Sequence, residues 1–199
     1  TIDNSSCKNV SAPKLGEGLV PVTIENDGTV KYADTSKSWY NYCDKIWANA
    51  VILENNASYS VGDTISEADI QSYFVWIPKY KYKLWNTGTA SEGIHEIEIV
   101  FDETNTTDVE GVSCKTPMTS GESGNCNNGE YMTHPSFISM NANGFWVGKF
   151  ETGYKGATSA AAAQVNANDT SKVIVKPNVY SWRGITVKNI FETSYNYKR

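Results

Sequence analysis

The stretch GFWVGKFETG, residues 144–153, combines large apolar side chains, glycines and two opposite charges in one strand-like run. Successive side chains of a strand point to opposite faces of its sheet. Lys149 and Glu151 therefore share one face with Val147. The other face carries the apolar residues and a glycine: Trp146, Gly148 and Phe150. This pattern is typical of an antiparallel sheet with one face over a hydrophobic layer, so we expect the apolar face of this run in the core.

Composition restricts the function classes. The chain has 199 residues, of which 40% are apolar and 20% charged, enough to bury a core in one large domain or two small ones. Its 12 tyrosines and 6 tryptophans suit sheet faces and recognition surfaces. The net charge of −5, without a basic cluster, predicts no nucleic-acid partner. No apolar stretch approaches the ~20 residues that cross a bilayer, which predicts no membrane contact by this segment.

Four cysteines, an even number, lie at positions 7, 43, 114 and 126. None forms a CxxC pair and the chain has two histidines, so a zinc site is disfavoured. Cys114 and Cys126 enclose a polar loop without an apolar anchor, and we predict a disulfide between them. A second disulfide is predicted between Cys7 and Cys43; pairing of Cys7 with Cys114 or Cys126, and four free thiols, are the alternatives. Disulfides imply an oxidising compartment, so we expect an extracellular or cell-surface location.

The first half of the chain predicts two hairpins. Residues 19–24 and 29–33 are strand-like and flank Asp27-Gly28, a pair of residues that favours a type I′ turn. Residues 38–42 and 46–53 form a second candidate pair.

Residues 74–85 form the longest strand candidate, with Lys79, Lys81 and Lys83 on one face. Residues 95–101 alternate glutamates with apolar side chains and are expected to pair with that strand, so that lysines oppose glutamates. We interpret these charges as a solvated hairpin face.

Helices are predicted to be few and short. Ser66 favours a helix over residues 67–73, and a second helix is expected from about Thr186. A polar stretch, residues 102–133, is expected to be a surface excursion that contains the disulfide loop. The predicted class is α+β, rich in antiparallel sheet. The expected division is an N-terminal hairpin segment, residues 1–60, and a β-rich region, residues 61–199; a single domain is the alternative.

A catalytic constellation is missing from the sequence. Neither His95 nor His134 has a Ser or Cys pattern around it that indicates a triad, and both are interpreted as structural. The polar cluster at Asn166, Asn168 and Asp169 matches no calcium loop and is interpreted as turn residues. The expectation is a protein that is not an enzyme, with no cofactor and no metal site.

The strand of residues 144–153 and the later stretch KPNVYSWRGITVKNIF resemble the formylglycine-generating-enzyme type of C-type lectin fold. The residues that carry the resemblance are Phe145, Trp146, Val147, Gly148, Glu151, Thr152, Pro177, Val179, Ser181 and Trp182. The resemblance implies structural roles for Glu151, Trp146 and Trp182, with Glu151 anchoring neighbouring backbone. It also implies that the helix near Thr186 is a midpoint of that fold, so that later strands would follow Arg199.

Longer blocks, among them WYNYCDKIWANAV and FVWIPKYKYKL, resemble surface proteins of gut Firmicutes, some of which are pilin-like. This resemblance implies an extracellular, non-catalytic surface or filament subunit, pilin- or adhesin-like, that displays a lectin-type domain. Its expected partners are further copies of itself and a surface ligand such as a glycan. The alternatives are a phage virion receptor-binding or tail appendage and an oxidase of the formylglycine-generating type, whose catalytic cysteines have no counterparts here.

Overall fold

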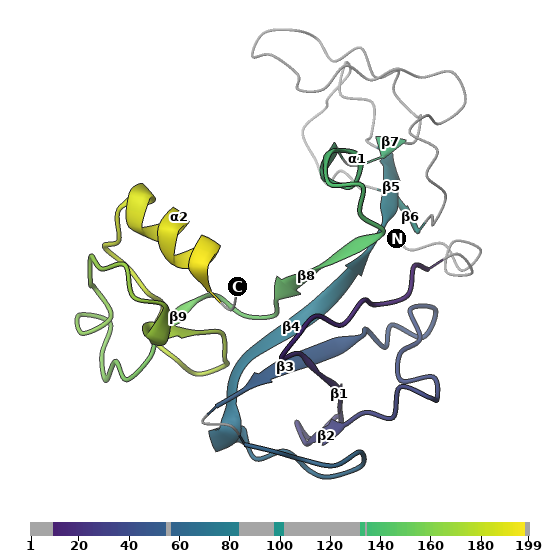
Figure 1. The fold of residues 1–199 in the computed structure, drawn as a ribbon, viewed down its shortest axis with the longest axis horizontal. Coiled ribbons are helices and arrows are strands. Elements are labelled where there is room, and N and C mark those ends of the chain that lie inside the picture. The colour runs from purple at the N-terminus through teal and green to yellow at the C-terminus, as the bar shows by residue number, and fades with distance from the viewer. Residues whose placement is uncertain (1–9, 55–56, 84–97, 102–131, 134, 198–199) are drawn as a thin grey trace, which may run out of the picture. The chain divides into compact units, whose positions relative to one another are not determined.

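The computed structural model describes residues 10–54, 57–83, 98–101, 132–133 and 135–197 (Figure 1). These residues form an α+β structure rich in antiparallel sheet, as the sequence predicts. The chain divides into two compact units. Unit 1 comprises residues 1–14, 41–46 and 76–145, and unit 2 comprises residues 15–40, 47–75 and 146–199. The division near residue 60 stays a prediction.

A five-stranded sheet has the order β2-β1-β3-β4-β8. Its strands are β1 (Val20–Ile24), β2 (Val30–Tyr32), β3 (Asn49–Leu53), β4 (Ile70–Pro78) and β8 (Gly144–Gly148). Strand β3 pairs antiparallel with both β1 and β4, which explains why four of its five residues are buried. Strands β4 and β8 each contribute residues to both units.

Hairpin β1–β2 forms where the sequence predicts it, but its turn is of another type. Gly28 has a φ of 90°, whereas Asn26 and Asp27 avoid the left-handed region that both central residues of a type I′ turn require. The Gly28 amide donates to the Glu25 carbonyl at 2.9 Å, and the Glu25 amide donates to Thr29 at 2.9 Å. This is a three-residue loop with a glycine bulge.

The core of unit 2 lies on one face of this sheet. Alternate positions of neighbouring strands share a face, and the buried cluster consists of Val22, Val30, Val51, Ile65, Ile70 and Tyr73.

The predicted pairing of residues 38–42 with 46–53 is confined to the residues next to the turn. Asn41 and Ile46 form a single bridge around a tight turn, in which Lys45 has a φ of 61°. The Asn41 side chain accepts from the Cys43 amide at 3.1 Å and so stabilises the turn. The following strand pairs with β1 and β4 instead, because those partners bury its apolar residues.

The predicted single strand over residues 74–85 is divided at Pro78. Strand β4 ends at Pro78, and β5 (Tyr80–Lys83) begins a separate sheet with β6 (Glu98–Phe101) and β7 (Met132–Thr133). Proline has no amide to donate, which favours this break. Strands β5 and β6 pair as predicted. The register places Lys83 opposite Glu98 but Lys81 opposite Val100, so the predicted opposition of lysine and glutamate holds at one described pair. Lys79, predicted on the solvated face, is buried at 5% exposure.

The apolar face expected from residues 144–153 is only half covered. Strand β8 stands at the end of the sheet order, where a strand has a neighbour on one side. Trp146 is half-buried and Phe150 is 36% exposed. The alternation of side chains predicts a strand correctly, but it does not show that the strand lies at an edge.

Helices are short. Ser66 caps a 3₁₀ helix, Glu67–Asp69, which ends four residues earlier than predicted because Ile70 already pairs with Leu53 of β3. Helix α1 (Pro135–Ser139) belongs to unit 1. Helix α2 (Val187–Asn196) begins after Thr186, as predicted. Among the described residues, none of the helices has the length and apolar character to span a membrane.

Candidate binding site beside helix α2

The C-terminal part of unit 2 is attached to strand β4. Strands β9 (Gly153–Tyr154) and β10 (Val173–Ile174) form a two-stranded sheet, and Val175 follows β10 directly. The Tyr73 amide donates to the Val175 carbonyl at 2.9 Å, and the Val175 amide donates to Gln71 at 3.3 Å. These bonds hold the chain that leads to α2 against the sheet.

Helix α2 is held through its polar residues. Asn166 Oδ1 accepts from the Thr186 amide at 3.0 Å and from Asn189 Nδ2 at 2.8 Å. Asn168 Oδ1 accepts from the Thr193 hydroxyl at 3.1 Å. Asp169 caps a 3₁₀ helix, Thr170–Lys172, so this cluster serves turns and helix ends, which agrees with its interpretation as turn residues.

The apolar side of α2 is exposed. Four apolar residues of the helix are largely exposed: Val187 (84%), Ile190 (47%), Phe191 (66%) and Tyr195 (53%). The rings of Phe191 and Tyr195 stack at 5.9 Å between centroids with an interplanar angle of 17°. We call these four residues the apolar stripe.

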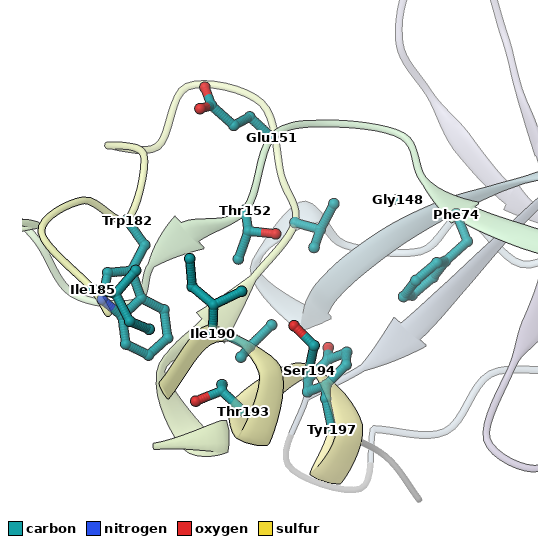
Figure 2. Close-up of a pocket in the computed structure, with 12 residues that line it drawn as sticks. Phe74, Gly148, Glu151, Thr152, Trp182, Ile185, Ile190, Thr193, Ser194 and Tyr197 are labelled. Carbon is teal, nitrogen blue, oxygen red and sulfur yellow. The ribbon is translucent and has the colours of Figure 1, made fainter. Parts of the chain in front are cut away.

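A pocket of about 520 Å³ adjoins the stripe, between the helix and the sheet of unit 2 (Figure 2). Its apolar lining consists of Phe74, Val173, Val175, Trp182, Ile185 and Ile190. Its polar side chains are Glu151, Thr152, Thr193, Ser194 and Tyr197. Figure 2 shows Ile190, Thr193 and Ser194 projecting from α2, so the helix contributes one wall. A cavity of this size, with a mainly apolar lining and a few polar side chains, suits a small ligand that has an apolar face and some hydrogen-bonding groups.

Tyr197 lines the pocket beside the sheet. Its hydroxyl lies 2.7 Å from the Ser72 hydroxyl of β4. Burial raises the pKa of Tyr197, although the bond to Ser72 acts in the opposite direction. The phenol therefore stays protonated at neutral pH and serves as a neutral hydrogen-bonding group.

The two charges of the 144–153 stretch have separate polar partners. Lys149 donates to Asn49 Oδ1 of β3 at 2.8 Å. The residue as a whole is exposed, but its ammonium lies against this buried amide, and the partial burial lowers the pKa of Lys149. Glu151 Oε2 accepts a hydrogen bond from the Ser181 hydroxyl at 2.6 Å. This partner is a side chain, whereas the resemblance implies that Glu151 binds neighbouring backbone groups.

Trp182 joins two segments of unit 2. Its indole nitrogen donates to the Val165 carbonyl at 2.7 Å, and its ring meets Tyr154 edge-on at 5.0 Å between centroids. The Gly153–Ser181 bridge brings the same stretch to β9. Trp182 therefore contacts both segments, and its structural role stays a prediction.

The cysteine predictions fall mainly outside the described residues. Cys43 is disulfide-bonded, and Cys7, Cys114 and Cys126 lie outside, so both predicted pairings stay predictions. His95 and His134 also lie outside the described part of the chain. Within that part, no three His, Cys, Asp or Glu side chains are grouped so as to hold a metal ion.

Comparison with protein-family models, with curated proteins and with solved structures gave no match to this chain.

Neither the pocket nor the stripe is among the features predicted from the sequence. The pocket combines Phe74 of β4, residues between 148 and 152, and residues between 173 and 197, a set that only the fold brings together. The stripe has a local signal, because Val187, Phe191 and Tyr195 follow one another at a spacing of four.

Proposed function

We propose that this chain is an extracellular surface or filament subunit, pilin- or adhesin-like and non-catalytic, that displays a lectin-type domain for binding. The observation that carries the proposal is the apolar stripe of α2 beside an apolar pocket in unit 2. Contiguous exposed apolar surface is typical of sites that bind a partner.

The disulfide at Cys43 supports the extracellular part of the proposal. Disulfides persist in oxidising environments and are rare where thiols are kept reduced. A second disulfide between Cys114 and Cys126 would fit the same compartment.

The lectin-type part of the proposal is supported by how two blocks of the resemblance meet. Glu151 belongs to the first block and Ser181 to the second, and their side chains are hydrogen-bonded. Trp182 of the second block packs on Tyr154, which follows the first. The two blocks therefore form one packed region of unit 2, which also lines the pocket.

Surface labelling tests the proposed location. Intact producing cells are treated with a membrane-impermeant amine reagent, and peptides of this chain are then identified by mass spectrometry. We expect labelled peptides that contain exposed lysines, with Lys37 as an example at 79% side-chain exposure. Recovery of the chain only after cell lysis would contradict an extracellular role.

A glycan array probed with the intact protein tests the binding part of the proposal. We expect retention by a surface carbohydrate or a related ligand and loss of retention when the pocket is filled. The variant Ser194→Phe places a ring in the pocket from an exposed position of α2, and Lys37→Ala is the surface control. Binding that is equal in both variants would place the ligand site elsewhere.

A further inference from the structure

We infer that the apolar stripe of α2 is a contact between two copies of this chain, packed antiparallel, with α2 of one copy against α2 of the other. The inference deepens the proposed function and rests on it, because it names the surface through which a surface subunit meets a second copy.

The amount of apolar surface on α2 is the first observation. Single exposed apolar residues are common on soluble proteins and need no explanation. Helix α2 has ten residues, and four of its apolar side chains are each 47% exposed or more. Residues three or four apart lie on one side of a helix, so Val187, Ile190, Phe191 and Tyr195 form one continuous surface.

A charged row beside the stripe identifies the partner. Lys188 and Glu192 each follow a stripe residue, Val187 and Phe191, by one position, so they flank the stripe along one edge. Their side chains are 79% and 37% exposed. Lys188 Nζ lies 3.8 Å from Glu192 Oε1, and Asn168 Nδ2 donates to Glu192 Oε2 at 2.9 Å, which orients the carboxylate.

The charged row is complementary to itself in one orientation. When two identical helices pack antiparallel, the same edge of each lies on the same side of the contact. Lys188 of one copy then faces Glu192 of the second copy, and the reverse pair forms as well. In a parallel pair the row would face the opposite edge of the partner helix, where Ile190 and Thr193 line the pocket. The charges therefore favour a second copy and an antiparallel contact.

The size of α2 limits the strength of the contact. Ten residues of helix extend for about 15 Å. A stable interface buries about 800 Å² per partner, which a single short helix does not supply. We expect a weak dimer, with a Kd between about 10 µM and 1 mM.

Sedimentation of the full, oxidised chain over protein concentrations that bracket this range tests the stripe. We expect a reversible dimer, and for Phe191→Asp a Kd raised at least about tenfold, since a charge replaces an apolar contact. Val61→Asp is the matched control, because Val61 is 57% exposed in unit 2 and lies outside α2. Thermal unfolding of both variants shows whether they fold. A protein that stays monomeric over the whole range, or a Phe191→Asp variant that dimerises normally, would overturn the inference.

A charge exchange tests the orientation. Lys188→Glu and Glu192→Lys each place like charges across the antiparallel contact, and we expect each variant alone to dimerise more weakly. An equimolar mixture restores both opposite-charge pairs between copies, although neither chain regains its internal pair. We therefore expect the mixture to dimerise as the unmodified chain does. A mixture as weak as its components would exclude this arrangement.

The two hypotheses fail separately. Surface labelling shows whether the chain lies outside the cell, and its result does not depend on whether the chain forms a dimer. A monomeric protein that is labelled on intact cells would exclude the α2 contact and leave the proposed function standing.

Discussion

Lys149 and Glu151 show how single residues of one strand serve two parts of unit 2. Lys149 binds Asn49 of β3, and Glu151 binds Ser181 in the stretch before α2. Asn49 is 7% exposed, so the pair with Lys149 also satisfies a buried amide oxygen. The charges that look out of place in an apolar run therefore attach the end of β8 to its neighbours.

Tyr73 allows a prediction of pH dependence. Its side chain is buried, and its hydroxyl donates to the Glu67 carboxylate. Burial first, and then this hydrogen bond, raise the pKa of Tyr73 above its ordinary value of 10.0. The folded state thus retains the proton at a pH where the unfolded state releases it. The stabilisation is complete below pH 10 and is lost as the pH rises above that value.

We expect the free energy of unfolding to fall above pH 10 by up to about 1.4 kcal/mol per pH unit for this proton. Tyr73→Phe should remove that part of the fall and cost about 1 kcal/mol at neutral pH. Lys149 acts with the opposite sign, because burial lowers its pKa, so the measurement is the difference between variant and unmodified chain in urea titrations. Tyr180→Phe, at a 46% exposed position, is the control. Parallel pH curves for Tyr73→Phe and the unmodified chain would contradict the assignment.

Gly144 has no room for a side chain. A Cβ at this position would lie 2.7 Å from the Ile77 carbonyl oxygen and still closer to the ring of Trp76. Trp76 is 4% exposed, and its indole donates to the Ser11 carbonyl at 3.0 Å, so the ring is not free to move. We expect Gly144→Ala to lower the free energy of unfolding by about 2–3 kcal/mol.

Urea unfolding followed by tryptophan fluorescence measures this loss. Gly16→Ala is the control, because its nearest neighbouring side-chain atom, on Leu19, would be 4.0 Å away. Equal stability of the two variants would show that the β4–β8 region relaxes around the new methyl group.

At the scale of elements, local signals predict local structure. Asp27-Gly28 predicts the β1–β2 hairpin, and Thr186 predicts the start of α2, because a turn and a cap each depend on a few neighbouring residues. Pairing over long distances has no such signal. The sequence assigns residues 46–53 to a neighbour in the chain, whereas β3 lies between β1 and β4. Buried Lys79 and the pocket are missed for the same reason, since both depend on contacts between distant segments.

The cap of α2 can be tested at this scale. Thr186 Oγ1 accepts a hydrogen bond from the Asn189 amide at 3.4 Å. Nearer the end of the helix, the Thr193 hydroxyl donates to Asn168 Oδ1. We expect Thr186→Ala to destabilise the helix by about 1 kcal/mol. Hydrogen exchange of the first-turn amides should accelerate by about fivefold, while Thr186→Ser keeps the acceptor and the slower rate. Unchanged exchange in Thr186→Ala would mean that Asn166 alone holds this end.

At the scale of the whole molecule, the α2 contact and the proposed filament place different demands on the surface. An antiparallel contact uses the same surface on both copies and closes into a dimer. A filament of such dimers needs a second, different contact. Chains that carry Phe191→Asp would therefore lose the dimer contact and keep the second contact. We expect them still to assemble, but with a different repeat distance between subunits.

The cysteines allow a last prediction, on how the chain is cross-linked. Cys43 lies in unit 1 and is disulfide-bonded, and the other cysteines of the chain are Cys7, Cys114 and Cys126. With Cys114 joined to Cys126, Cys43 is left with Cys7 as its partner. Loop entropy then gives about 3 kcal/mol for the shorter loop and about 4 kcal/mol for the longer one.

We expect non-reducing peptide mapping to give two linked peptides, Cys7 with Cys43 and Cys114 with Cys126. Reduction should lower protection from hydrogen exchange in unit 1, for example at Tyr82 of β5, because the disulfide-bonded Cys43 belongs to that unit. Val51 of β3 in unit 2 is the internal control and should keep its protection. A peptide that joins Cys43 to Cys114 or Cys126 would exclude the predicted pairing. Equal loss of protection in both units would show instead that the disulfides stabilise the molecule as a whole.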